Sequence, residues 1–161
     1  MNSLKITTLK VIFLISLISL ISAYFIEYIL GHQPCNLCVI ERIPYVLSIT
    51  LIILNYFFKK NEQFIILLLI LLFSFSFILS FYHFGIEQGF FEESAVCSIK
   101  NASDTISKEE LLEQLQVRII SCKDVTFRIF GFSLTSFNMI ISLILTFLLL
   151  KDFINYEKFK K

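Results

Sequence analysis

Four long apolar runs follow one another along the chain, separated by short polar segments. They cover about residues 9–30, 38–58, 64–84 and 129–150. A helix that crosses the roughly 30 Å hydrocarbon core of a bilayer needs about 20 residues, so each run is long enough to span a membrane. The pattern predicts an all-α integral membrane protein, in which a bundle of four transmembrane helices forms one membrane domain over residues 1–161.

The start of the second helix follows from its length. Its strictly apolar part, residues 43–58, has only 16 residues and is short for a span. We therefore expect this helix to begin near Cys38, which places the motif formed by Cys35 and Cys38 at its N-terminal end. Pro44 lacks an amide hydrogen and is expected to bend the helix just below this motif.

The first run could instead be a cleaved signal peptide, because Lys5 and Lys10 precede its apolar part. That part is longer than the apolar region of a usual signal peptide, and Ile21 stands where a cleavage site needs a small residue. We therefore expect the run to be retained as a transmembrane helix.

The only sizeable polar segment lies between the third and fourth runs, at residues 85–128. Ser107 and Glu110 have the spacing of a capping box, and leucines at helical spacing follow them. This predicts a short amphipathic helix lying on the bilayer surface. The same pattern would also fit a helix that packs on a small soluble subdomain.

Positive charges near the helix ends predict the orientation of the chain, since cytoplasmic loops carry an excess of Lys and Arg. One side of the bundle receives the lysines Lys5, Lys10, Lys59, Lys60, Lys151, Lys158, Lys160 and Lys161. The other side has fewer positive charges, and most of them are spread through the long loop. Both termini are therefore expected in the cytoplasm, and all four cysteines on the outer face.

Composition excludes several classes of protein. Hydrophobic residues make up 57% of the chain and charged ones 17%, whereas soluble domains have about 25% charged residues. This excludes a soluble globular domain and a disordered chain, and it makes the lipid bilayer the expected surroundings. The formal net charge of +1 leaves no concentrated basic face, so no nucleic-acid partner is expected.

Four cysteines on an oxidising face can pair in three ways. Spacing favours Cys35 with Cys38, which leaves Cys97 with Cys122. A disulfide across two intervening residues closes so short a loop that it stabilises little, so the first pair is better explained by thiol–disulfide exchange. For the second pair alone, a purely structural disulfide is the simpler interpretation.

The expected surroundings of Cys38 favour a reactive thiolate. Unpaired amide groups and the helix dipole stabilise a thiolate at a helix N-terminus. Arg42 follows four residues later, which would place its guanidinium one turn below Cys38 on the same face. Arg42 could also be an interfacial arginine that only reaches toward the membrane surface.

Two more ionisable residues lie near the outer ends of predicted spans. Glu27 is about one turn from the end of the first, where a carboxylate is a functional candidate but could simply reach water. His83, at the end of the third, could relay a proton, bind a polar head group or be an ordinary interfacial histidine.

The stretch from Cys35 to Arg42, CNLCVIER, resembles the C-x-L-C-x-x-[EQ]-R motif of the DsbB family, the quinone-dependent disulfide-forming proteins of the bacterial inner membrane. Further features follow in the family's order: YHFGIE at residues 82–87, the pair Cys97 and Cys122, and FGFS at residues 130–133. The resemblance extends over essentially the whole chain and is far more specific than a lone C-x-x-C motif.

The resemblance implies an enzyme that reoxidises a periplasmic, thioredoxin-fold dithiol protein of the DsbA type. The partner's thiolate would attack Cys97 and release Cys122. Cys122 would then attack Cys35 and leave Cys38 as a thiolate. The electrons would pass from there to ubiquinone or menaquinone in the membrane.

Two residues would assist the quinone reaction by the same resemblance. Arg42 would stabilise the negative charge that develops against the quinone ring, and His83 corresponds approximately to a family position near the quinone. No resident metal is implied.

Three other interpretations are weighed against this one. A vitamin K epoxide reductase-like enzyme has a similar bundle, but its C-x-x-C motif comes late in the chain. The four cysteines could bind a soft metal in a transporter or sensor. Against this, only two histidines are present, His32 and His83, neither has a ligand-like spacing, and no charged path crosses the remaining spans. A structural membrane subunit with inert disulfides would show no redox exchange at Cys35 or Cys38.

Overall fold

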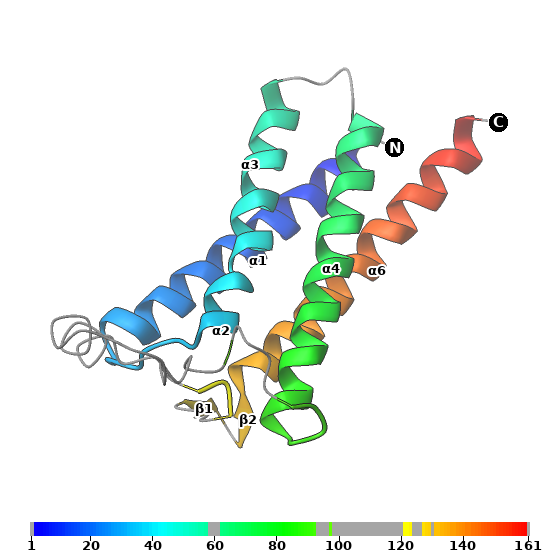
Figure 1. The fold of residues 1–161 in the computed structure, drawn as a ribbon. Helices are drawn as coiled ribbons and strands as arrows, with labels where there is room; N and C mark the ends of the chain where they lie inside the picture. Colours follow the sequence, from blue (N-terminus) through cyan, green and yellow to red (C-terminus); the bar gives the residue numbers. More distant parts are fainter. Residues whose placement is uncertain are drawn as a thin grey trace, which may run out of the picture.

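Helices make up most of the computed structural model, which describes residues 2–57, 62–92, 97, 121–123, 127–129 and 131–160. The helices, drawn in Figure 1, are α1 at Asn2–Tyr28, α2 at Asn36–Ile40, α3 at Ile43–Phe57, α4 at Glu62–Glu87 and α6 at Leu134–Lys160. Two short strands, β1 at Arg128–Ile129 and β2 at Phe132–Ser133, pair antiparallel.

Four helical stretches are long and apolar enough to cross a membrane: Thr7–Tyr28, Asn36–Phe57, Gln63–Glu87 and Leu134–Asn155. The predicted all-α bundle of four transmembrane helices is therefore confirmed. Both chain termini lie at the end of the bundle opposite to α2 and the strands (Figure 1). The amphipathic helix predicted after Ser107 falls outside the described residues.

The second spanning stretch consists of two helices. α2 ends at Ile40 and α3 begins at Ile43, with Glu41 and Arg42 in the turn between them. Pro44, in the first turn of α3, has no amide hydrogen to donate to the Ile40 carbonyl, so the continuous hydrogen-bond ladder is interrupted here. As a result, Glu41 bonds to α4 and α6, whereas Arg42 bonds to α1.

The fourth long helix begins later than residue 129, where the apolar run predicted it. The strands β1 and β2 pair before this helix, and α6 begins at Leu134. Gly131, at φ 86°, supplies the positive φ that the turn between the strands needs. Ser133 then caps the helix, since its Oγ accepts a hydrogen bond from the Ser136 amide at 3.3 Å. Apolar periodicity alone does not distinguish a short strand from the start of a helix.

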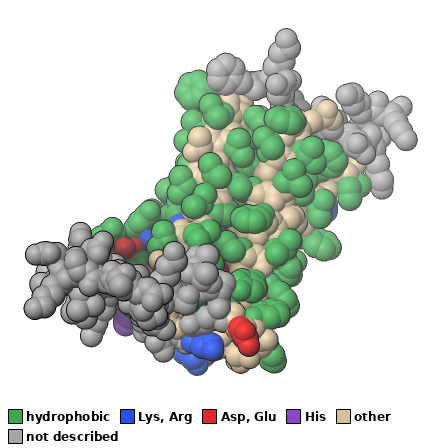
Figure 2. Space-filling model, viewed as in Figure 1, with side chains coloured by type: hydrophobic (Ala, Val, Ile, Leu, Met, Phe, Trp, Pro, Cys, Tyr) green, Lys and Arg blue, Asp and Glu red, His purple; other side chains and the backbone are tan. Residues whose placement is uncertain are grey.

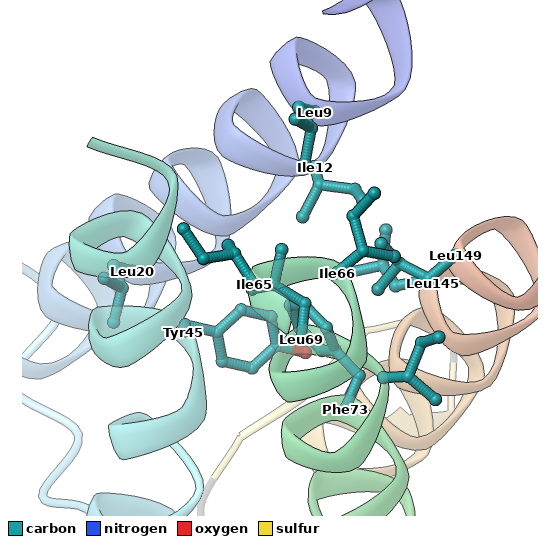
Figure 3. Close-up of a cluster of buried hydrophobic side chains, with 11 residues drawn as sticks. Leu9, Ile12, Leu20, Tyr45, Ile65, Ile66, Leu69, Phe73, Leu145 and Leu149 are labelled. Atoms are coloured by element: carbon teal, nitrogen blue, oxygen red, sulfur yellow. The ribbon is translucent and has the colours of Figure 1, made fainter. Parts of the chain in front are cut away.

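The bundle interior combines an apolar cluster with small hydroxyl residues. The buried cluster in Figure 3 draws on α1, α3, α4 and α6 and contains Leu9, Ile12, Leu20, Tyr45, Ile65, Ile66, Leu69, Ile70, Phe73, Leu145 and Leu149. The Ser48 hydroxyl donates to Ser16 at 3.0 Å between α3 and α1, and Ser76 lies 3.0 Å from Ser142 between α4 and α6. Small residues of this kind let membrane helices approach closely.

The outer surface of the helices is strongly apolar. Large side chains that are more than half exposed include Ile18, Ile21, Phe75, Ile78 and Phe147. Figure 2 shows hydrophobic side chains covering the helices on the visible face. In water such a surface would drive association, whereas hydrocarbon solvates it, so the outer surface is suited to contact with lipid.

Candidate active site

A second buried cluster surrounds the cysteines near α2. Its core members are Cys35, Leu37, Ile86, Cys97 and Cys122, each at most 6% exposed. The half-buried side chains of Cys38, Ile40, Leu79 and Tyr82 pack against them. The two cysteine pairs, Cys35 with Cys38 and Cys97 with Cys122, are far apart in the sequence but share one protected environment.

Cys35 is the N-cap of α2. Its Sγ accepts a hydrogen bond from the Cys38 amide at 3.3 Å and lies 2.7 Å from the Cys38 Sγ; both cysteines are free thiols. The sequence assigned the thiolate-stabilising helix N-terminus to Cys38. In the structure the capping sulfur belongs to Cys35, because α2 begins at Asn36 and puts Cys38 inside its first turn.

Cys97 and Cys122 form a disulfide with a Cα–Cα distance of 5.4 Å, which is the pairing that the spacing favoured. Both residues are buried. The Sγ atoms of Cys122 and Cys35 and a ring nitrogen of His83 all lie within 4.8 Å of one another. The outer disulfide is thus next to the thiol pair of α2.

His83 connects Cys35 to a buried carboxylate. Its Nε2 atom lies 3.5 Å from the Cys35 Sγ, and its Nδ1 atom lies 2.8 Å from Glu41 Oε1. The Asn138 amide donates to the second carboxylate oxygen of Glu41 at 2.8 Å, and the Tyr45 hydroxyl donates to the Asn138 carbonyl oxygen. The Cys35 thiol, the His83 imidazole and the Glu41 carboxylate therefore form a chain of contacts, and Asn138 of α6 holds the carboxylate in position.

These contacts make Cys35 an acidic thiol. The hydrogen bond from Cys38 and the hydrogen bond and charge of His83 lower the pKa of Cys35 from the ordinary value of 9.0 to about 4, although burial acts in the opposite direction. Hydrogen bonds to a thiolate stabilise it relative to the thiol. When both thiols of α2 are reduced, the negative charge is therefore favoured on Cys35, with Cys38 as donor.

This leads to a prediction about pH. Because the pKa in the folded protein lies below the ordinary value, the Cys35 thiolate is expected to persist as the pH falls from 9 and to be lost near pH 4. His83→Ala should raise the midpoint by about 1–2 pH units, since one charge-assisted hydrogen bond is worth about 1.5–3 kcal/mol. The measurement is thiolate absorbance in a Cys97→Ser/Cys122→Ser background, with His32→Ala as the control. An unchanged midpoint in His83→Ala would contradict the assigned contact.

Arg42 forms an ion pair with Glu27 of α1, and its guanidinium lies 4.9 Å from the centre of the Tyr24 ring. The side chains are only 14% and 22% exposed, for Arg42 and Glu27 respectively. The sequence left open whether Glu27 is functional or simply reaches water. In the structure it has a defined partner, Arg42. The pair fixes the guanidinium against α1.

A pocket of about 370 Å³ opens beside these groups. Cys35, Cys38, Arg42 and His83 all line it, together with apolar side chains of α1 and α6 such as Leu20, Ile26, Phe137 and Ile141. Its volume and its combination of apolar walls with a few polar groups are typical of a site for a small organic molecule. The pocket brings together the predicted residues Cys38 and Arg42 even though the helix breaks between them.

Sequence reasoning gave no role to Glu41, Asn138 or Thr135. The hydroxyl of Thr135 donates to Glu87 at 2.6 Å and lies 3.4 Å from His83 Nδ1. A polar residue in an otherwise uncharged membrane span is the signal that could have identified Asn138, because such residues usually face the bundle interior. Glu41 belonged to the recognised motif, but its partner could not be inferred before the helices were placed.

Comparisons with known proteins agree with the geometry. A family model described as "Disulfide bond formation protein DsbB" matches residues 6–151, a range that contains all four cysteines, Arg42 and His83. The uncharacterized protein RP370 of Rickettsia prowazekii (strain Madrid E) is 31% identical over 137 residues, which cover 84% of this chain and 80% of that protein. No solved structure matches significantly.

Proposed function

This chain belongs to the DsbB family of disulfide bond formation proteins, and we propose that it is a thiol:quinone oxidoreductase. It reoxidises a periplasmic, DsbA-like dithiol protein and passes the electrons to ubiquinone or menaquinone. The observation that carries the proposal is the proximity of the two cysteine pairs, with the Cys122 Sγ within 4.8 Å of the Cys35 Sγ. Disulfide exchange needs direct attack of one sulfur on another, and at this separation the two sulfurs need to move only a short distance to react.

Electrons enter through the outer disulfide. A thiolate of the partner attacks Cys97, the Cys97–Cys122 bond breaks, and Cys122 leaves as a thiolate. Cys122 attacks Cys35 in the oxidised Cys35–Cys38 pair, and Cys38 leaves as a thiolate. The partner's second thiolate displaces Cys97, which attacks Cys122 and releases Cys35. A disulfide between Cys97 and Cys122 beside two free thiols, as described above, corresponds to the completed transfer of two electrons and two protons.

His83 and Glu41 assist the last of these exchanges. Cys35 is the leaving group when Cys97 attacks Cys122, and a thiol with a lower pKa leaves faster. The His83 Nε2 atom, 3.5 Å from the Cys35 Sγ, stabilises the departing Cys35 thiolate and shares a proton with it. Glu41 keeps the imidazole oriented toward Cys35 through the contact with Nδ1.

The pocket beside Cys38 fits a quinone head group by its chemistry, with apolar walls, the thiols of Cys35 and Cys38, and one guanidinium. Formation of a disulfide between Cys35 and Cys38 would release two electrons and two protons, which a quinone held in this pocket would accept. While Cys35 is joined to Cys122, Cys38 alone carries the thiolate charge and presents its sulfur to the pocket. Arg42 stabilises negative charge at the pocket wall, and the apolar side chains of α1 and α6 exclude water.

The proposal places the active site in the periplasm and both termini in the cytoplasm of a bacterial inner membrane. The termini and the cysteine cluster lie at opposite ends of the bundle, which supports an arrangement on two sides of a membrane (Figure 1). Lysines are in excess at the end of the bundle where both termini lie, which supports the assignment of that end to the cytoplasm. Labelling of a Cys35→Ser/Cys38→Ser/Cys97→Ser variant, whose single cysteine is Cys122, in intact cells with a membrane-impermeant thiol reagent would test it. Protection of Cys122 until the cells are lysed would contradict it.

The activity is tested by mixing the purified protein with a reduced thioredoxin-fold dithiol protein and a soluble ubiquinone analogue. We expect the quinone absorbance to fall over many turnovers, with one partner disulfide formed for each quinone reduced. A menaquinone analogue in parallel identifies the preferred acceptor. Single-turnover oxidation of the partner without quinone consumption would contradict the proposal.

The same assay separates the rival functions. A soft-metal membrane protein would contain stoichiometric metal as isolated and would not turn over. A structural subunit with inert disulfides would show no redox exchange at Cys35 and would reduce no quinone. A vitamin K epoxide reductase-like enzyme would reduce the epoxide substrate, but the C-x-x-C motif at the start of the second span argues against it.

A further inference from the structure

The cysteines and His83 make up a set of metal ligands. The Sγ atoms of Cys35 and Cys122 and a ring nitrogen of His83 lie within 4.8 Å of one another, and all three residues are buried. The Cys38 Sγ lies 2.7 Å from the Cys35 Sγ. Three thiolates and one imidazole are a common tetrahedral donor set for Zn²⁺, with bonds of about 2.0–2.3 Å and often with two cysteines in C-x-x-C spacing.

An independent contact orients His83 as metal-binding histidines are oriented. A ligating histidine usually donates its second ring N–H to a carboxylate, which fixes the tautomer and makes the ligand more basic. His83 Nδ1 lies 2.8 Å from Glu41 Oε1, so Nε2 faces the sulfurs. The Asn138 amide, 2.8 Å from Glu41 Oε2, holds the carboxylate from its other side.

We propose that the fully reduced protein binds one Zn²⁺ through Cys35, Cys38, Cys122 and the Nε2 atom of His83. The Cys97–Cys122 disulfide withholds the Cys122 sulfur, so the donor set is complete only after that bond has accepted two electrons and two protons from a dithiol. The ion then replaces the thiol protons. Reformation of the Cys97–Cys122 bond removes one ligand and weakens the site.

The consequence is a metal-dependent block of the reduced enzyme. The ion occupies three of the sulfurs needed for exchange, so Cys35 and Cys38 cannot be reoxidised while it is bound. Binding releases protons and therefore strengthens as the pH rises. The block of turnover rests on the proposed function, whereas metal binding itself does not.

Two cysteine variants provide a matched test. Cys97→Ser and Cys122→Ser both lack the outer disulfide, but the first keeps all four proposed ligands and the second loses one. Each is purified in detergent, reduced with a phosphine, and titrated with ZnCl₂ in competition with a chromophoric chelator. We expect Cys97→Ser to bind one equivalent of Zn²⁺ and Cys122→Ser to bind it at least about 100-fold more weakly. That loss exceeds the 10–100-fold drop in affinity typical when a residue that only contacts a metal ligand is replaced.

The histidines provide a second matched pair. His83→Ala should lose binding to a similar extent, whereas His32→Ala, which alters another residue of the same pocket, should not. Glu41→Gln should weaken binding by about 10–100-fold. In Cys97→Ser, Co²⁺ should give the absorption of a tetrahedral thiolate site. Circular dichroism in the same detergent checks that each variant keeps its helices.

Equal Zn²⁺ affinity in Cys97→Ser and Cys122→Ser, or in His83→Ala and His32→Ala, would overturn the proposal. So would the absence of binding by a Cys97→Ser protein with native helix content. Failure of the proposed function is distinguishable from these results. Quinone turnover in chelator without any Zn²⁺ binding refutes only the metal site, whereas Zn²⁺ binding without quinone turnover refutes only the oxidoreductase.

Discussion

Replacing Cys38 with serine is expected to abolish quinone reduction, with a loss of about 10³-fold or more, as for removal of an enzyme nucleophile. Cys38 lines the pocket together with Arg42. In the proposed mechanism its thiolate is released when Cys122 attacks Cys35. Without Cys38, the Cys35–Cys38 disulfide cannot form, and the proposed route has no thiol that transfers electrons to a quinone. The measurement is quinone absorbance under multiple turnover with a reduced dithiol partner.

The same variant should reveal the internal exchange. The free thiol of Cys35, next to Cys122, is expected to open the Cys97–Cys122 bond and form a Cys35–Cys122 disulfide. Peptide mapping under non-reducing conditions detects this species. Cys35→Ser is the matched control, because it also stops turnover but cannot form the bond. A Cys38→Ser protein that still reduces quinone at the normal rate would exclude the proposed electron route.

The fold could be predicted largely from the apolar pattern, because four uninterrupted runs in a bilayer allow little besides helices. The helix boundaries at local interruptions could not be predicted from this pattern. The α2–α3 interruption depends on Pro44, which indicated a bend but not that Glu41 and Arg42 would bond to different helices. The β1–β2 hairpin before Leu134 depends on a turn at Gly131 within an apolar stretch.

The candidate site was predictable where its residues are neighbours in sequence and not where the fold assembles them. Cys35, Cys38 and Arg42 lie within one motif, so their chemistry could be argued from spacing. The link from Cys35 through His83 to Glu41 and Asn138 joins α2, the following turn, α4 and α6. His83 had no ligand-like spacing in the sequence for the same reason, since its partners come from other elements.

Helical spacing predicted that Arg42 lies near Cys38, but the structure positions Arg42 through a different contact. A continuous helix would set Arg42 one turn from Cys38 on the same face. The helix is broken between them, and the ion pair with Glu27 of α1 holds the guanidinium instead. Both Arg42 and Cys38 nevertheless line one pocket, because α1 and α2 form adjoining parts of its wall.

Arg42→Ala should lower the rate of the quinone half-reaction by about 10²–10³-fold, the loss typical when one charge-stabilising donor is removed from an active site. Exchange between the partner and Cys97 should continue at close to its normal rate, because Arg42 bonds to Glu27 of α1. Single-turnover mixing measures the two half-reactions separately. Arg42→Lys should recover part of the rate, since it keeps the charge but not the planar group.

Glu27→Gln decides whether the effect comes from the charge or from the broken ion pair. Both Arg42→Ala and Glu27→Gln remove the pair, which is mostly shielded from water, and removing one partner of a buried pair is destabilising. Only Arg42→Ala removes the positive charge from the pocket. If the cation stabilises negative charge during electron transfer, Glu27→Gln keeps most of the quinone rate even where its unfolding temperature falls. An equal loss in both variants would instead assign Arg42 a purely structural role, and electron transfer from Cys38 would then need another source of charge stabilisation.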